Sequence, residues 1–279
     1  MVTRYHKFAL VAAFGLALAL TLTGCAPAKD NGDDDNGGSS NQSNNGGGGG
    51  SSSGCTAANN TSTQYCSNGT LKQYGSVTDN GGQTYKTVVI GTQTWMAENL
   101  NYNVTGSRCY GDYDGGDSQG NCAKYGRLYD WATAMNIAAS CNDIRVASCR
   151  ATVWSKHQGI CPPNWHLPSD TDWNVLMKFV NPSCTDNNTC TDAGTKLKAA
   201  SGWSGGGNGT NDYGFLALPG GYGNSDGSFD YVGNDGNWWS SSEYSAGYAY
   251  YRDMHYDNEL AYWRSNNKSY LFSVRCLQD

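Results

Sequence analysis

The stretch YKTVVIGTQTWMAENLNY, residues 85–102, opens as an apolar strand and closes with amides, an acid and aromatic side chains. Tyr85 to Ile90 is rich in β-branched residues, and Gly91-Thr92 supplies a tight turn. Because Gln93 to Met96 then runs back with a similar apolar pattern, the stretch predicts a β-hairpin.

Three polar side chains, those of Glu98, Asn99 and Asn101, follow this hairpin on either side of Leu100. In a loop, carboxylate and amide groups satisfy backbone donors and acceptors that a regular sheet would otherwise pair. We therefore expect these residues to form a structural frame. A Glu98 carboxyl buried without a donor would instead favour a catalytic role.

Two helices are predicted before residue 198. The segment Gly126 to Ala139 carries apolar residues at helical spacing. A second helix begins at Ser169, whose hydroxyl can cap it while Asp172 completes an S-x-x-D capping box. The apolar stripe that this second helix should turn inward comprises Trp173, Leu176, Met177 and Val180.

After Lys198 the sequence changes to short strands between glycine-rich turns. Two helices followed by an antiparallel sheet of short strands indicate an α+β fold rather than a doubly wound parallel one. The predicted strands are Gly214 to Leu218, Ser228 to Val232, Asn237 to Ser241, Tyr248 to Met254 and Tyr270 to Cys276.

Residues 1–24 have the pattern of an export signal. A basic start precedes an apolar run, Phe8 to Leu22, that is too short to span a bilayer, and LTGC follows at residues 22–25. LTGC is similar to the lipobox of bacterial lipoproteins, so we expect Cys25 to carry a lipid anchor. The alternative is an ordinary secreted protein that is cleaved at this point.

Residues 25–54 combine the anchor with a tether of Gly, Ser, Asp and Asn that has too little apolar surface to fold. We expect residues 55–82 to form a small disulfide-pinned lead-in and residues 83–279 to form the packed domain. Cleavage would remove two of the 18 basic residues and none of the 24 acidic ones, which leaves a formal charge of −8. This charge argues against a nucleic acid as partner.

Ten cysteines follow Cys25, and an even number in an exported chain predicts five disulfides. Spacing alone does not prove which cysteines pair. If near neighbours pair, the two cysteines left over close the longest loop, and their bridge contributes about 4–5 kcal/mol. The pairs in this set are Cys55–Cys66, Cys109–Cys122, Cys141–Cys149, Cys184–Cys190 and Cys161–Cys276.

Several stretches resemble, in the same order, the Fibrobacter succinogenes major paralogous domain family. The resemblance covers nearly all of residues 83–279, and it implies an extracytoplasmic module with disulfides, often found on lipoproteins, that has no established biochemical activity. The stretches are YKTVVIGTQTWMAENLNY (85–102), CYGDYD (109–114), YGRLYDWATAM (125–135), CPPNWHLPSDTDW (161–173), GFLALPGGY (214–222), NWWSSSE (237–243) and SVRC (273–276).

One of these stretches resembles a second group of proteins. WHLPSDTDW (165–173) is similar to a signature of formylglycine-generating enzymes, and with the closing SVRC (273–276) it implies a C-type-lectin-like fold. In that fold a long disulfide that pins the terminal strands fits the pairing of Cys161 with Cys276. The sugar-chelating motifs of C-type lectins, E-P-N or Q-P-D with W-N-D, do not occur in this sequence.

The loop GDYDGGDSQGN (111–121) is the candidate metal site of the sequence. Asp112, Asp114 and Asp117 offer hard oxygen ligands of the kind that calcium prefers. The loop lacks the terminal glutamate of an EF-hand. A calcium site at these three residues and a plain acidic loop clipped by a disulfide are both consistent with this pattern.

Aromatic residues are concentrated between Tyr222 and Tyr270. Tyr and Trp combine a large apolar face with a polar tip, which suits stacking on sugar rings. Side chains alternate between the two faces of a strand, so the segment Tyr248 to Met254 carries aromatic rings on both faces. Only one of these faces can pack against the core. We therefore predict an exposed binding surface that comprises Tyr222, Trp238, Trp239, Tyr248, Tyr250, Tyr251 and Trp263.

These observations favour a non-enzymatic recognition module that is anchored by lipid to the outer membrane, exposed at the cell surface and able to bind polysaccharide or an envelope protein. An enzyme related to the formylglycine-generating group is the second hypothesis, and it would need an unpaired reactive cysteine. A passive structural domain of the envelope is the third. We expect no cofactor apart from the calcium considered above.

Overall fold

The computed structural model describes most of the chain after residue 53. The predicted signal sequence, the Cys25 anchor and nearly all of the tether lie outside the described residues. No helix in the described part is long and apolar enough to cross a membrane. The described residues are 54–67, 69–113, 116–143, 145, 149 and 156–279, and they belong to one compact unit.

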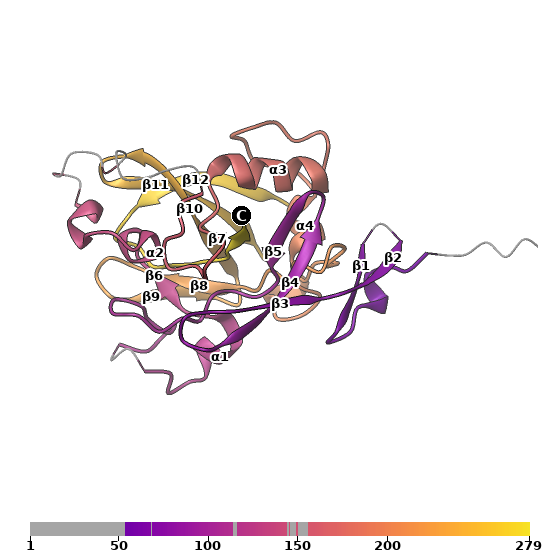
Figure 1. Ribbon diagram of the computed structural model, residues 1–279, viewed down its shortest axis with the longest axis horizontal. Helices are drawn as coiled ribbons and strands as arrows, with labels where there is room; N and C mark the ends of the chain where they lie inside the picture. The colour runs from indigo at the N-terminus through magenta and orange to yellow at the C-terminus, as the bar shows by residue number, and fades with distance from the viewer. Residues whose placement is uncertain (1–53, 68, 114–115, 144, 146–148, 150–155) are drawn as a thin grey trace, which may run out of the picture. The chain divides into compact units, whose positions relative to one another are not determined.

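One sheet has five strands in the order β3-β4-β5-β14-β7, and every pair in it is antiparallel. The predicted hairpin is confirmed, since β4 pairs with β5 and Gly91 turns the chain with a φ of +61°. The C-terminal strand β14 lies between β5 and β7 (Figure 1). The strands are β3 (Gly75–Thr78), β4 (Thr84–Ile90), β5 (Gln93–Met96), β7 (Trp165–His166) and β14 (Leu277–Gln278).

A second sheet has seven strands and contains most of the late aromatic residues. Its main path runs β12-β11-β10-β13-β6, and β8 joins β10 to β9. The longest strand, β10, therefore lies in the interior of this sheet. The strands are β6 (Leu128–Tyr129), β8 (Gly220–Gly223), β9 (Phe229–Val232), β10 (Asp235–Ser245), β11 (Tyr248–His255), β12 (Ala261–Asn267) and β13 (Phe272–Ser273).

The segment before the packed domain forms a two-stranded sheet of β1 (Gln64–Ser67) and β2 (Thr70–Gln73). The Cys55–Cys66 disulfide pins it. Tyr65 is buried in the main apolar cluster, and its hydroxyl accepts a hydrogen bond from the Val89 amide at 3.1 Å. The lead-in thus contributes a side chain to the core.

The helix α3 (Asp170–Val180) is confirmed where the capping box predicts it. Ser169 Oγ accepts from the Asp172 amide, and Asp172 Oδ2 accepts from the Ser169 amide at 2.9 Å. The predicted inward stripe is buried. The other described α-helices have one or two turns each: α1 (Asn121–Tyr125), α2 (Trp131–Met135) and α4 (Ala193–Leu197).

Two expectations about secondary structure are wrong. The helix predicted from Gly126 to Ala139 is reduced to Trp131–Met135, because Leu128–Tyr129 forms strand β6 and Asn136 ends α2 in a left-handed conformation with a φ of 53°. The predicted strand Gly214 to Leu218 is absent because Leu216 has a φ of 56°, and this segment makes only an isolated bridge between Ala217 and Lys198. In both places a residue with positive φ interrupts a regular hydrogen-bond ladder.

Five disulfides join the ten described cysteines, and they are the pairs that the near-neighbour rule predicts. The core consists of two apolar clusters. One is built around Trp95, Trp173 and Phe215, and the other around Trp239 and Phe272. The domain is therefore an α+β fold, rich in strands and stabilised by disulfides.

Candidate functional site

Asn99 lies at the centre of a buried hydrogen-bond network, as the frame hypothesis predicts. Its Nδ2 donates to the Tyr125 carbonyl at 2.9 Å, and its Oδ1 accepts from Trp238 Nε1 at 2.8 Å. The same oxygen accepts from Arg275 Nη2 at 2.7 Å, and the guanidinium also donates to the Phe215 carbonyl. Complete burial lowers the pKa of Arg275 to about 9. Asn99 thus joins four distant segments.

The neighbouring Glu98 carboxylate is also tied to the backbone. Its Oε2 accepts from the Lys86 amide at 2.7 Å. The carboxyl is therefore not buried without a donor, and the condition that would favour a catalytic Glu98 is not met.

The predicted binding surface is wrong for three of its seven residues. Trp238 and Trp239 are 0 % exposed, and Tyr251 is 7 % exposed. Because β10 is an interior strand with both faces covered, Trp238 enters one apolar cluster while its neighbour Trp239 enters the other. A ligand cannot reach these rings.

The other four predicted residues divide into two groups. Tyr250 stacks on Trp263 with ring centres 4.9 Å apart, and Tyr248 on the same strand is 36 % exposed. Trp263 Nε1 donates to Asp170 Oδ2 at 2.8 Å, which holds this group against α3. Tyr222 belongs to a different surface, on β8.

On that surface, Tyr222 and Tyr231 form a stacked pair with ring centres 5.8 Å apart and planes inclined by 19°. Tyr231 is 53 % exposed, whereas Tyr222 is half-buried. Tyr231 has a φ of +64°, which costs an L-residue with a bulky side chain about 1–2 kcal/mol. The chain thus holds an exposed ring in an unfavourable backbone conformation, which is characteristic of ligand-binding positions.

A histidine between two carboxylates lies on the adjoining strands. His255 Nδ1 lies 2.8 Å from Asp235 Oδ1, and Nε2 lies 2.8 Å from Asp253 Oδ2. The hydrogen bonds with Asp235 and then Asp253 raise the pKa of His255 to about 9, so the ring is an imidazolium that donates to both. Asp253 is 2 % exposed, and its Oδ1 has no hydrogen-bond partner among the described residues.

Strand pairing brings the tyrosines near the carboxylates. β8 pairs in parallel with β10 at Gly221 and Gly236, so Tyr222 is level with Asn237, and Asp235 lies two residues earlier on β10, on the same face of the sheet. Burial, with a further contribution from nearby carboxylates, raises the pKa of Tyr222 to about 12. We call this region the tyrosine–aspartate surface, and it comprises Tyr222, Tyr231, Asp235, Asp253, His255, Tyr262 and Arg264.

The side of this surface formed by β12 carries a cation. Arg264 Nε lies 3.5 Å from Asp253 Oδ2, and its guanidinium lies over the Tyr262 ring at 4.2 Å from the centre. The arrangement offers exposed apolar ring faces next to charged hydrogen-bonding groups. It is suited to binding a molecule with both apolar faces and hydroxyl groups.

The sequence analysis missed most of these residues. Asp253 and His255 are two apart on one strand and therefore share a face, which is a signal that could have been found. Asp235 joins them only through the pairing of β10 with β11, where it lies opposite His255.

We predict that the stability of the domain falls as the pH rises between about 6.5 and about 9. The pKa of His255 is about 9 in the folded protein and has its ordinary value of 6.5 in the unfolded chain, so the folded state binds this proton more tightly. Its contribution, about 2 kcal/mol after discounting for solvent, is complete below pH 6.5 and is lost as the pH rises through 9. Urea denaturation across this range should show the slope, and His255→Gln should flatten it. An equal slope in the variant would refute this origin.

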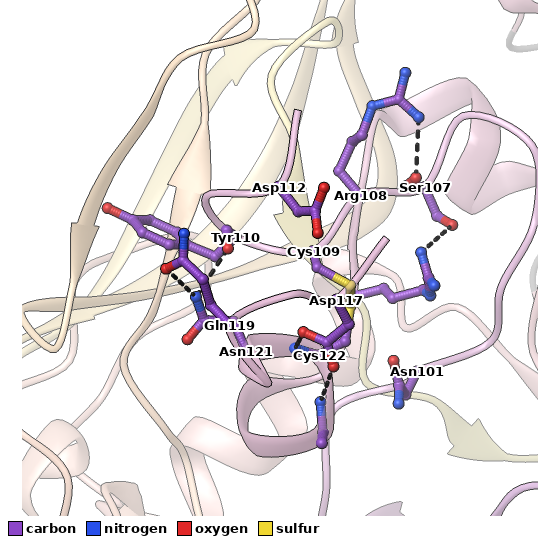
Figure 2. Close-up of a disulfide and its surroundings, with 12 residues drawn as sticks. Asn101, Ser107, Arg108, Cys109, Tyr110, Asp112, Asp117, Gln119, Asn121 and Cys122 are labelled. Atoms are coloured by element: carbon purple, nitrogen blue, oxygen red, sulfur yellow. Dashed lines mark hydrogen bonds between the residues drawn. A yellow bond between two sulfur atoms is a disulfide. The ribbon is translucent and has the colours of Figure 1, made fainter. Parts of the chain in front are cut away.

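The acidic loop places its described carboxylates on backbone amides, and Figure 2 shows Asp112 and Asp117 near the Cys109–Cys122 disulfide. Asp112 Oδ2 accepts from the Ser118 amide at 2.9 Å, and Asp117 accepts from the amides of Cys122 and Ala123. Asp117 also lies near the sulfur atoms of a disulfide, which offer no thiolate to a metal. Asp114 lies outside the described residues, so the calcium site at Asp112, Asp114 and Asp117 stays a prediction.

Together, these features define a disulfide-stabilised α+β domain in which exposed tyrosine rings lie near a histidine that pairs with two buried carboxylates. The family described as Fibrobacter succinogenes major domain matches residues 88–278, more than half of the sequence, and the chain belongs to this family. The motifs quoted from the sequence predict this membership correctly. No solved structure matches the chain.

Proposed function

We propose that this protein is a lipid-anchored, non-catalytic recognition module that binds polysaccharide at the cell surface through the tyrosine–aspartate surface. In this proposal Cys25 holds the chain in the outer membrane, and the Gly/Ser/Asp/Asn tether of residues 25–54 lets the domain reach its ligand. We also propose a C-type-lectin-like fold. The long Cys161–Cys276 disulfide and the pairing of β14 with β5 support it.

The observation that carries the proposal is the stacked pair of Tyr222 and Tyr231 beside the Asp235–His255–Asp253 cluster. A sugar ring has apolar C–H faces, which pack on aromatic rings, and an edge of hydroxyl groups, which hydrogen-bond to polar side chains. The surface supplies ring faces from Tyr222 and Tyr231, and the accessible polar groups are those of His255 and Arg264, which the buried carboxylates hold in place. The strained backbone of Tyr231 supports a binding role, because packing alone does not require an exposed ring there.

The state of the cysteines favours recognition over the enzyme hypothesis. All ten described cysteines are in disulfides, so none offers the thiolate that a reactive-cysteine enzyme would use.

We expect Tyr231→Ala to weaken binding to an insoluble polysaccharide about fivefold, since loss of one stacked ring removes about 1 kcal/mol. The measurement is retention of the detergent-solubilised full-length protein on cellulose, chitin and xylan. Tyr244→Ala is the matched control, because Tyr244 is also 53 % exposed but lies on β10, outside this surface. Equal retention of wild type and Tyr231→Ala would refute the proposed surface, and no wild-type retention on any of the three would favour the passive envelope domain.

A further inference from the structure

The strand β9 places a carboxylate next to the two stacked tyrosines. Tyr222 on β8 and Asp230 on β9 are direct partners in the antiparallel pair, so their side chains lie on the same face of this hairpin. Tyr231 follows Asp230, and in a regular strand its side chain would lie on the opposite face. Its φ of +64° interrupts the alternation, and its ring stacks on Tyr222. Two rings and one carboxylate therefore share one face of the hairpin.

The Asp230 carboxylate is exposed and only partly bonded. Its Oδ2 accepts from Asn224 Nδ2 at 2.7 Å, and the same nitrogen donates to Ser228 Oγ at 2.9 Å, which fixes the position of the carboxylate. Its Oδ1 accepts no hydrogen bond from the described residues, and no ion pair between described residues includes Asp230. A ligand can therefore reach an unneutralised carboxylate beside the 53 % exposed ring of Tyr231.

The charge around the ring pair is negative. Burial raises the pKa of Tyr222 to about 12, and the Asp230 carboxylate makes the next contribution, ahead of Asp235. The two cations of the tyrosine–aspartate surface, His255 and Arg264, are paired with the carboxylates of that surface. A free carboxylate and the electron-rich face of an aromatic ring both attract a cation.

We infer that the polysaccharide bound at this surface carries free amino groups, and that a protonated amino sugar packs its ring on Tyr231 and donates through its ammonium group to Asp230 Oδ1. This inference rests on the proposed function and names the class of polysaccharide. An ammonium group is a compact cation with three donors, which suits both the free oxygen and the tyrosine ring. An N-acetylated sugar lacks this charge, and the Asp230 carboxylate would repel a uronic acid.

The test compares a tetramer of β-1,4-linked glucosamine with the N-acetylglucosamine tetramer. Isothermal titration calorimetry on the detergent-solubilised full-length protein, at low salt and mildly acidic pH, measures both dissociation constants. We expect the glucosamine tetramer to bind about tenfold more tightly, because an ion pair and a cation–π contact add to the stacking that both tetramers share. Asp230→Asn should weaken binding of the glucosamine tetramer about fivefold and leave binding of the N-acetylated tetramer unchanged.

Asp226→Asn is the matched control, because Asp226 is also an exposed carboxylate of the β8–β9 hairpin but accepts from the amide and hydroxyl of Ser228. It should preserve the preference for the glucosamine tetramer. Equal binding of the two tetramers by the wild type, or an undiminished preference in Asp230→Asn, would overturn the inference. Tighter binding of tetralysine than of the glucosamine tetramer, lost in Asp230→Asn, would overturn it in favour of a lysine-bearing protein partner.

The outcome separates this inference from the proposed function. Retention on cellulose, chitin or xylan that depends on Tyr231, without a preference for the glucosamine tetramer, would refute the amino-sugar assignment alone. Absence of retention together with absence of binding to either tetramer would refute both.

Discussion

Asn99→Leu should lower the free energy of unfolding by about 3–5 kcal/mol, although leucine has nearly the same size. The substitution removes the oxygen that accepts from Trp238 Nε1 and from two nitrogens of Arg275. Arg275 is 0 % exposed, so its guanidinium would keep only the carbonyl groups of Phe215 and Leu216. Urea denaturation followed by tryptophan fluorescence measures the loss.

Asn188→Leu is the control for this prediction, because the Asn188 side chain is exposed and its hydrogen bonds are local, to Thr185 Oγ1 and from the Thr189 amide. It should change stability by less than about 0.5 kcal/mol. Adding Arg275→Met to Asn99→Leu should recover part of the loss, since no buried charge is then left poorly paired. A loss below about 1 kcal/mol in Asn99→Leu would show that the network is not essential to the fold.

The Arg275 network is one instance of a wider feature of this domain, in which buried cations satisfy carbonyl oxygens of irregular segments. Lys198 Nζ donates to the carbonyls of His255 and Asn258, each at 2.9 Å. Lys268 Nζ donates to the Ala246 carbonyl at 2.8 Å and to Glu243 Oε1 at 2.5 Å. Because one ammonium has three donors, it can join several loops that lack a regular ladder. Sequence patterns cannot predict such contacts, since the acceptors are backbone atoms of any residue type.

Features with local causes could be predicted from the sequence. The hairpin depends on one turn at Gly91, and α3 depends on the capping pair of Ser169 and Asp172. Four of the five disulfides close loops of 6 to 13 residues, where proximity along the chain favours pairing. In each case the signal and the structure that it determines lie within a few residues of one another.

The division of aromatic residues between core and surface could not be predicted, because it depends on which strands are central. Alternation predicts that one face of a strand is exposed, but β10 is covered on both faces, so Trp238 and Trp239 are both core. The candidate site likewise depends on strand pairing between distant segments. Asp235 meets His255 only through the pairing of β10 with β11, and Tyr231 lies near Tyr222 only through the pairing of β9 with β8. No sequence rule indicates a positive φ at a tyrosine.

The double substitution Cys161→Ala with Cys276→Ala should lower the free energy of unfolding by about 4–5 kcal/mol, because the bridge spans 115 residues, within which Cys184–Cys190 closes only a short loop. It joins the segment before β7 to the start of β14, and both strands belong to the sheet that holds the first hairpin. The matched control is removal of Cys184–Cys190, which spans 6 residues and should cost about 2 kcal/mol. Urea denaturation of both variants measures the difference in the free energy of unfolding. Equal losses of stability would contradict the loop-length account, because the two disulfides would then stabilise the folded state only through local packing.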